Sequence, residues 1–227
     1  MTIADALTQV KDRISRAAEA ASRDPAEVSL VAVSKTKPPA AVREAYLAGQ
    51  RDFGENYAQE LAQKAEELGD LPDIRWHFIG HLQTNKAKVV VKAAHVVHAV
   101  DSIALVKELA KRWEKEGRLD SPKLPLLVEV NVGGEAAKHG VSAVELASVL
   151  DAIDAHPALV LRGLMTMPPN DLEAARRAFE ALASLRNLHG GKARLPQLSM
   201  GMSDDLEIAI ACGATMVRVG SAIFGAR

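Results

Sequence analysis

The sequence predicts a (β/α)8 TIM barrel that forms one domain over residues 1–227. Eight short runs of β-prone residues alternate with helical patterns, and parallel strands need helical crossovers of this kind between them. The length of 227 residues lies within the range in which α/β barrels run as one domain. A doubly wound open sheet is the alternative, and the number of expected strands argues against it.

The first expected element is an amphipathic helix over residues 3–21. Apolar Ile3, Leu7, Val10 and Ile14 recur at helical spacing and give this segment one apolar face. Since helices follow the first seven strands, the N-terminal helix would complete a ring of eight.

The expected strands are short apolar runs that end at glycine or polar residues. They cover residues 28–34, 51–56, 75–80, 95–102, 124–132, 159–167, 195–203 and 215–222. The third is short and the fourth is rich in histidine, so their strand patterns are the least regular of the eight.

The stretches between the strands repeat apolar residues every three or four positions, as a helix with one buried face does. These expected helices cover residues 40–49, 57–68, 85–93, 103–117, 142–153, 171–188 and 203–213. Residues 119–125 are interpreted as a loop into the fifth strand, because nothing else in the chain suggests a second domain.

Composition excludes several classes of partner. The 28 basic and 29 acidic residues leave a formal charge of −1 without a long block of one sign, so neither nucleic acid nor an anionic membrane is an expected partner. The N-terminus lacks the apolar region of a signal peptide, and no stretch reaches membrane-spanning length. The single Cys212 cannot form an internal disulfide. We expect a cytoplasmic protein, monomeric, with a small-molecule partner.

Lys35 is the first candidate site residue. In a barrel, the carboxyl ends of the strands meet at one mouth. Alternation along the first strand puts Val31, Val33 and Lys35 on one side, so Lys35 enters the mouth if that side faces the lumen. A lysine among apolar strands loses hydration, which favours the neutral, nucleophilic amine that condenses with aldehydes. Lys37 is expected to face solvent.

Two loops after the last strands are suited to bind a phosphate. Gly220 and Ser221 follow the eighth strand, where a short helix would present free N–H groups. Ser199 and Gly201 follow the seventh strand and precede a helix expected to begin near Ser203. Plain turns and a helix cap at Ser203 are the alternative reading of these residues.

Arg218 lies two residues before Gly220 and alternates with Val217 and Val219. It either points into the barrel beside a ligand or forms an outward ion pair with a helix. Buried arginine is rare unless it is paired.

Seven segments of the chain resemble one known family over essentially its whole length. They read VAVSKTKP, FGENYAQE, WHFIGHLQTNK, VEVNVGGEAAKHG, RGLMTM, LSMGMSDDLEIAI and VRVGSAIFG. This set is similar to the pyridoxal phosphate homeostasis proteins, also called the YggS or PROSC family. That family resembles the barrel domain of alanine racemase without the racemase's additional C-terminal β domain.

The resemblance implies that pyridoxal 5′-phosphate is held as a Schiff base on Lys35. It implies that Ser199, Gly220 and Ser221 hold the phosphate, that Arg218 lies near the pyridine nitrogen, and that Asn56 lies close to the cofactor. Met200 and Gly201, next to Ser199, complete the expected cofactor-binding set.

The resemblance also implies storage and supply of the cofactor and balance of amino-acid pools, without an expected catalytic residue or enzymatic activity. Two chemical arguments agree. An arginine at the pyridine nitrogen weakens the electron sink, because guanidinium only donates hydrogen bonds. Neither Tyr46 nor Tyr57 has an evident claim to the second base that racemisation needs. The apo forms of pyridoxal-phosphate enzymes are possible recipients of the cofactor.

Two alternative activities share these residues: an amino-acid racemase that uses pyridoxal phosphate, and a Schiff-base aldolase of sugar phosphates. No metal site is expected. His77, His81, His95 and His98 have spacings that would suit a helix, but their segments are expected strands. His77 is instead expected to be a hydrogen-bonded barrel histidine, and His81 to border the mouth.

Overall fold

The computed structural model describes residues 1–116, 122–133 and 139–225. Eight parallel strands close into a barrel in the order of the chain, with β1 paired to both β2 and β8. The strands are β1 (Ser29–Val33), β2 (Asp52–Glu55), β3 (Arg75–Phe78), β4 (Val96–Val100), β5 (Leu124–Glu129), β6 (Leu159–Met165), β7 (Gln197–Ser199) and β8 (Met216–Val219). The predicted (β/α)8 barrel is therefore confirmed, including its irregular third and fourth strands, and the open sheet is wrong.

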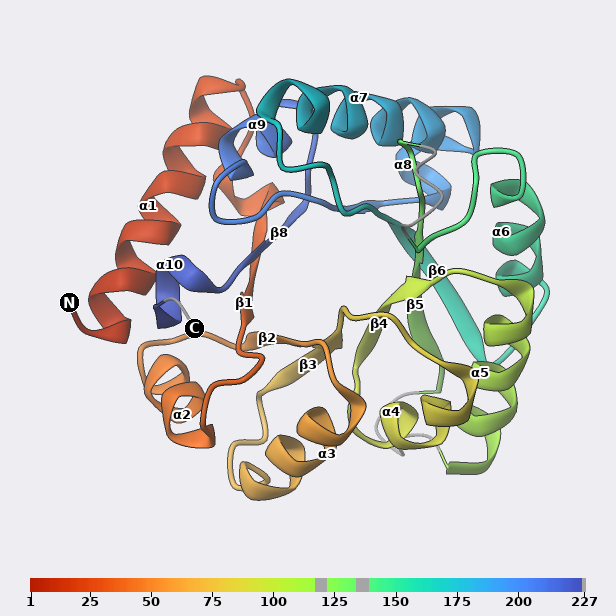
Figure 1. The fold of residues 1–227 in the computed structure, drawn as a ribbon, viewed down its shortest axis with the longest axis horizontal. Coiled ribbons are helices and arrows are strands. Elements are labelled where there is room, and N and C mark those ends of the chain that lie inside the picture. The colour runs from red at the N-terminus through yellow and green to blue at the C-terminus, as the bar shows by residue number, and fades with distance from the viewer. Residues whose placement is uncertain (117–121, 134–138, 226–227) are drawn as a thin grey trace.

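Helices surround the strands in a ring (Figure 1). They are α1 (Ile3–Ala20), α2 (Pro39–Leu47), α3 (Ala58–Glu67), α4 (Ala87–Ala93), α5 (Ile103–Glu116), α6 (Leu146–Asp154), α7 (Leu172–Leu188), α8 (Gly191–Arg194), α9 (Leu206–Ala211) and α10 (Ser221–Phe224), with 3-10 turns at Pro25–Glu27 and Thr84–Lys86. Within the described ranges, no helix is long and apolar enough to span a bilayer.

The N-terminal helix completes the ring as expected. Its first turn is closed by a capping box, in which Thr2 and Asp5 each accept a hydrogen bond from the other's backbone N–H. The buried face includes Leu7, Val10 and Ile14 and packs against α9 and α10. In Figure 1, α1 accordingly lies beside the last two helices of the chain.

Two helices begin three or more residues later than the sequence predicts. The helix expected from residue 142 begins at Leu146, because Ser142 and Glu145 bond each other's backbone N–H groups and form a separate turn. The helix expected near Ser203 begins at Leu206, because Asp205 accepts a hydrogen bond from the Met202 N–H and fixes a turn there. The loop expected at residues 119–125 lies partly outside the described residues.

The core has two layers. The larger one fills the space between strands and helices, with fully buried side chains such as Phe53, Phe78 and Phe179. A small cluster of Ala99, Leu127 and Met165 forms a separate apolar patch contributed by β4, β5 and β6. Hydrogen bonds between polar side chains, described below, connect β2, β3, β4, β7 and β8 inside the barrel. The cavity lies at the mouth of the barrel.

Candidate functional site

A cavity of about 280 Å³ opens at the carboxyl ends of the strands. It is lined by residues that lie in β1 and β8 or follow β1, β2, β3, β6, β7 and β8 in the chain. They are Val33, Lys35, Thr36, Lys37, Asn56, Ile79, Met167, Met202, Ser203, Asp204, Arg218, Gly220, Ser221 and Gly225. Its size falls just below the roughly 300–1,000 Å³ of pockets for drug-sized ligands, which suits a small ligand.

Both lysines of the segment after β1 line this cavity. The expectation that Lys37 faces solvent is wrong, because strand alternation does not continue past Ser34. Thr36 has a left-handed backbone with φ 63°, and the Lys37 N–H donates to the Ser34 carbonyl at 3.0 Å. This turn brings Lys35 and Lys37 to the same cavity.

A buried lysine on α3 holds that turn in place. The Lys64 Nζ donates to the Ser34 carbonyl, Glu55 Oε1 and Glu60 Oε1, each at 2.7 Å. Ser34 Oγ also donates to Glu55 Oε1 at 2.6 Å. Burial raises the pKa of the Glu55 carboxyl, although the hydrogen bonds from Lys64 and Ser34 act to lower it. The residue before Lys35 is therefore tied to β2 and α3.

Two hydroxyls and a glycine lie together on the β7 and β8 side of the cavity. Ser221 Oγ donates to Ser203 Oγ at 3.0 Å, and both residues line the cavity with Gly220. A Cβ on Gly220 would lie 3.0 Å from the Val33 carbonyl oxygen, so only glycine fits there without a shift. The short helix expected after β8 is present as α10. Since α9 begins at Leu206, Ser203 does not cap it.

Three expected site residues do not line the cavity. Ser199 is fully buried, and its Oγ accepts from Arg218 and bonds His98 Nδ1 at 2.9 Å. Met200 is fully buried in the larger part of the apolar core, between strands and helices. Gly201 has φ 93°, and a Cβ there would lie 2.6 Å from the Ala209 Cβ. Lys35, Asn56, Arg218, Gly220 and Ser221 do line it.

Arg218 points into the barrel, so the outward ion pair is wrong. It is 3% exposed, and its guanidinium donates to Ser199 Oγ at 2.7 Å and to the Thr166 carbonyl at 2.9 Å. Burial lowers the pKa of Arg218 to about 10, against the charges of Glu129 and Asp205 that raise it. Arg218 therefore stays cationic near neutral pH and still reaches the cavity wall.

Glu129, at the end of β5, is the acidic counterpart of Arg218. Burial raises the pKa of the Glu129 carboxyl to about 7, while the Arg218 charge lowers it and the Asp101 charge raises it. The net charge beside Arg218 therefore changes within the neutral pH range.

A chain of hydrogen bonds runs from Arg218 across the inside of the barrel. Ser199 bonds His98 Nδ1, His98 Nε2 bonds His77 Nδ1, and His77 Nε2 bonds Asp52 Oδ1, each at 2.9 Å. Since guanidinium only donates and carboxylate only accepts, the neutral histidines fit one direction, with each group donating toward Asp52. The expectation that His77 is a hydrogen-bonded barrel histidine is confirmed.

The charges at this chain are fixed by its surroundings. Burial, and to a lesser extent the Arg218 charge, holds the pKa of His98 well below its usual range, so His98 is neutral. Burial acts to raise the pKa of Asp52, but hydrogen bonds from His77 and Arg75 outweigh it and hold the value at about 2. The chain therefore has a cation at one end and an anion at the other.

Asn56 supplies an unpaired acceptor. Its Oδ1 is buried without a hydrogen-bond partner, and the residue lines the cavity. Its backbone is fixed by close packing on Gly80, where a Cβ would lie 2.2 Å from the Asn56 carbonyl oxygen. An orphaned buried amide beside a cavity is suited to a polar ligand group.

The sequence does not single out Lys64 or Glu129. Lys64 stands four residues after Glu60, which is the pattern of an exposed helical ion pair. Glu129 continues an apolar strand and could have been flagged only as a charge at a strand end. Lys35 carried a stronger signal, because strand alternation puts it on the same side as Val31 and Val33.

Comparison with known proteins agrees with this geometry. The family model "alanine racemase, N-terminal domain" matches residues 6–227. The alanine racemase of Corynebacterium glutamicum has the same fold, with a TM-score of 0.70 and 18% identity over 98% of this chain and 61% of that chain. The chain thus belongs to the family of alanine racemase N-terminal domain barrels.

The more similar relatives narrow this class. A pyridoxal phosphate homeostasis protein of Pseudomonas aeruginosa is 50% identical over 100% of this chain and 96% of its own length. That of Escherichia coli K12 is 44% identical over 99% and 97%. PipY of Synechococcus elongatus, solved with pyridoxal phosphate bound, is 37% identical with a TM-score of 0.81 and covers 99% of this chain and 100% of that chain. The chain belongs to the pyridoxal phosphate homeostasis protein family.

Proposed function

We propose that the chain binds pyridoxal 5′-phosphate in this cavity, with Lys35 as the residue that forms a Schiff base with the aldehyde. The observation that carries the proposal is the placement of Lys35 in one cavity with two hydroxyls and a buried arginine. Relatives named for pyridoxal phosphate homeostasis, and PipY with the cofactor bound, support it.

The residues present fit this ligand. Ser203 and Ser221 offer hydroxyl donors, and Gly220 leaves its backbone open to close approach, as a phosphate requires. The unpaired Asn56 amide suits the ring hydroxyl. We assign the phosphate to Ser203, Gly220 and Ser221, because Ser199 is buried beneath Arg218. Ser199 then positions Arg218, and Met200 and Gly201 shape the loop.

The bound cofactor would supply an electron sink, and Arg218 would weaken it. Its guanidinium can only donate to the pyridine nitrogen, so it does not stabilise the protonated ring as a carboxylate would. The hydrogen bonds to Ser199 and Thr166 keep it in that orientation.

We further propose that the protein stores and supplies the cofactor and has no enzymatic activity. Racemisation needs a second base opposite the lysine, and neither tyrosine of the chain lines the cavity. Tyr57 is 51% exposed, and Tyr46 stacks under Arg51 at 3.9 Å. A racemase assay with several amino acids should therefore show no turnover that depends on Lys35.

The proposed working unit is one domain and one chain, with apo forms of pyridoxal-phosphate enzymes as recipients. Transfer from the loaded protein to an apo-enzyme should restore that enzyme's activity faster than passive loss of cofactor into a trap protein. Equal rates would mean that delivery needs no contact between the two proteins.

The absorption spectrum of the purified protein with added cofactor tests the site. The wild type should show the Schiff-base band, and borohydride reduction should fix the cofactor on the peptide that contains Lys35. Lys35→Ala should lose both signals. Lys37→Ala is the matched control, because Lys37 lines the same cavity. A colourless wild type, or an adduct that maps to Lys37, would refute the proposal.

A further inference from the structure

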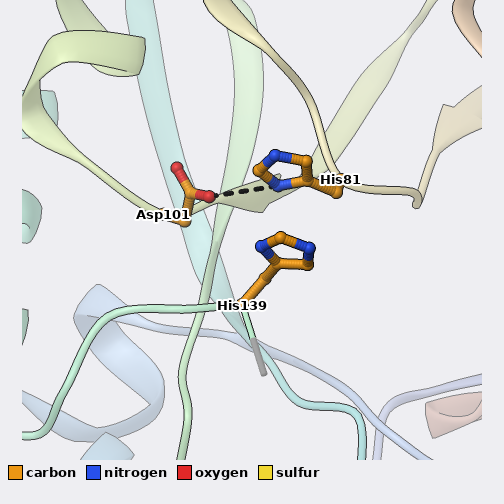
Figure 2. A group of neighbouring side chains, drawn as sticks. All are labelled: His81, Asp101 and His139. Atoms are coloured by element: carbon orange, nitrogen blue, oxygen red, sulfur yellow. Dashed lines mark ion pairs between the residues drawn. The ribbon is translucent and has the colours of Figure 1, made fainter. Parts of the chain in front are cut away.

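Three ligand-type side chains meet at the mouth of the barrel outside the cavity described above. His81 follows β3, Asp101 follows β4, and His139 precedes Val141, which pairs with Val130 after β5. Because β3, β4 and β5 are neighbours in the barrel, the fold brings the three side chains together (Figure 2). None of them lines the proposed cofactor cavity.

The three side chains are close enough to share one ion. His81 Nδ1 lies 3.3 Å from Asp101 Oδ2, and the His81 and His139 rings stack with their centroids 3.7 Å apart. One ligand atom from each residue lies within 4.8 Å of the other two. A tetrahedral ion with bonds of about 2.0–2.2 Å holds its ligand atoms roughly 3.3–3.6 Å apart.

Binding therefore needs a contraction of at most about 1.5 Å at the widest pair, by the same bond lengths. Both histidines are exposed, so their rings can turn from the stacked arrangement toward the carboxylate. Asp101 is the less exposed partner, at 18%, and stands directly after a barrel strand. It provides the fixed point onto which the two imidazoles close.

The other histidines that tempted a metal reading are committed elsewhere. His77 and His98 bond each other and their neighbours in the barrel, and His95 Nδ1 accepts a hydrogen bond from the Trp76 N–H. His81 joins residues from separate strand ends instead, a grouping that no spacing in the sequence reveals.

We propose that His81, Asp101 and His139 bind one divalent transition-metal ion, with Zn²⁺ as the expected occupant. Two imidazoles and a carboxylate are ligands that Zn²⁺ accepts, and three protein ligands leave a fourth position for water or an exchangeable ligand. This metal site is separate from the proposed cofactor cavity, and the proposal does not depend on the proposed function.

Calorimetric titration of the untagged full-length chain with Zn²⁺, after dialysis against a chelator, tests this assignment. The wild type should bind one ion per chain, and His81→Ala, Asp101→Asn and His139→Ala should each weaken binding at least about tenfold. The double variant His81→Ala/His139→Ala should abolish it. His189→Ala, which changes a histidine at the end of α7, should bind as the wild type does.

Two results would overturn the proposal: a wild type that takes up no Zn²⁺, or one whose affinity survives in the double variant. Circular dichroism of each variant shows whether it is folded, and the exposure of both histidines predicts that the alanine variants are. Visible absorption of bound Co²⁺ provides a second readout, because a site of these three ligands gives a spectrum that the double variant must lack.

Discussion

Replacing Lys64 with methionine should destabilise the protein more than any surface substitution. Lys64 is 3% exposed and Glu55 is fully buried, and Lys64 Nζ lies 2.7 Å from Glu55 Oε1. The same ammonium group also donates to the Ser34 carbonyl. Removal of one partner of a buried ion pair costs about 3–5 kcal/mol, because the remaining charge is left in a poor solvent. For a chain of this size each kcal/mol lowers Tm by roughly 2–4 °C, so a loss of about 6–20 °C is expected.

The loss of stability in Lys64→Met should depend on pH. Without Lys64, the Glu55 pKa rises further above its unfolded value, so the folded state binds a proton more readily than the unfolded state does. The stability of the variant then falls as pH rises, so the loss of stability in Lys64→Met should be larger at pH 8 than at pH 5.

Urea unfolding followed by circular dichroism measures the effect, with Lys88→Met as control. Lys88 is 55% exposed, and its ion pair with Glu116 spans 3.6 Å, so this variant should change stability by less than about 0.5 kcal/mol. The double variant Lys64→Met/Glu55→Gln should recover part of the loss, because no buried charge is left unpaired. A penalty for Lys64→Met below about 1 kcal/mol at both pH values would refute the account.

Three further substitutions test other parts of the barrel. The Glu129 pKa of about 7 means that the folded state holds a proton on this carboxyl more tightly than the unfolded state does. The free energy of unfolding of the wild type should therefore fall between pH 5 and pH 8 by about 2–3 kcal/mol relative to that of Glu129→Gln. The same pH dependence for both proteins in urea unfolding would contradict this. His98→Leu leaves His77 and Ser199 without their hydrogen-bond partner and should lower the free energy of unfolding by about 2–5 kcal/mol. At about 2–4 °C per kcal/mol, a Tm within 2 °C of wild type would show that these hydrogen bonds do not stabilise the protein to that extent. Gly201→Ala should cost more than Gly49→Ala in the same unfolding assay: both have φ near 90°, but only at Gly201 would the new Cβ meet another side chain, and equal losses would show that the crowding is relieved.

The alternation of strands and helices was enough to predict the barrel, because each parallel crossover leaves a clear change of hydrophobic period. The same alternation put Val33 and Lys35 on one side of the first strand, and both line the cavity. For Arg218 it left the inward and outward positions open, and the structure decides for the inward one. It failed just past the strand ends. The left-handed Thr36 turns Lys37 into the cavity, and no periodic pattern contains that information.

Contacts between distant segments were the other limit. Ser199 looked like a phosphate ligand because its loop resembles one, yet its hydroxyl is used by Arg218 and by His98, which is 101 residues away. Lys64 has the local pattern of a surface residue and becomes buried only because α3 packs where β1 ends. Such roles depend on tertiary packing, which overrides local pattern.

Under the proposed function, the hydrogen-bond chain behind Arg218 would favour binding of the cofactor over proton transfer to it. With both histidines neutral, each link donates away from Arg218 and toward Asp52, so the chain delivers no proton to the cavity unless both histidines reverse. Reversal would leave His77 Nε2 unprotonated against the Asp52 carboxylate, two acceptors 2.9 Å apart. Under the proposed function, Arg218 would donate a hydrogen bond to the ring nitrogen of the cofactor, with its guanidinium held by Ser199 and Thr166, and would transfer no proton to the ring. This hydrogen bond would help to orient the pyridine ring of the cofactor but would do little to stabilise a carbanion on it.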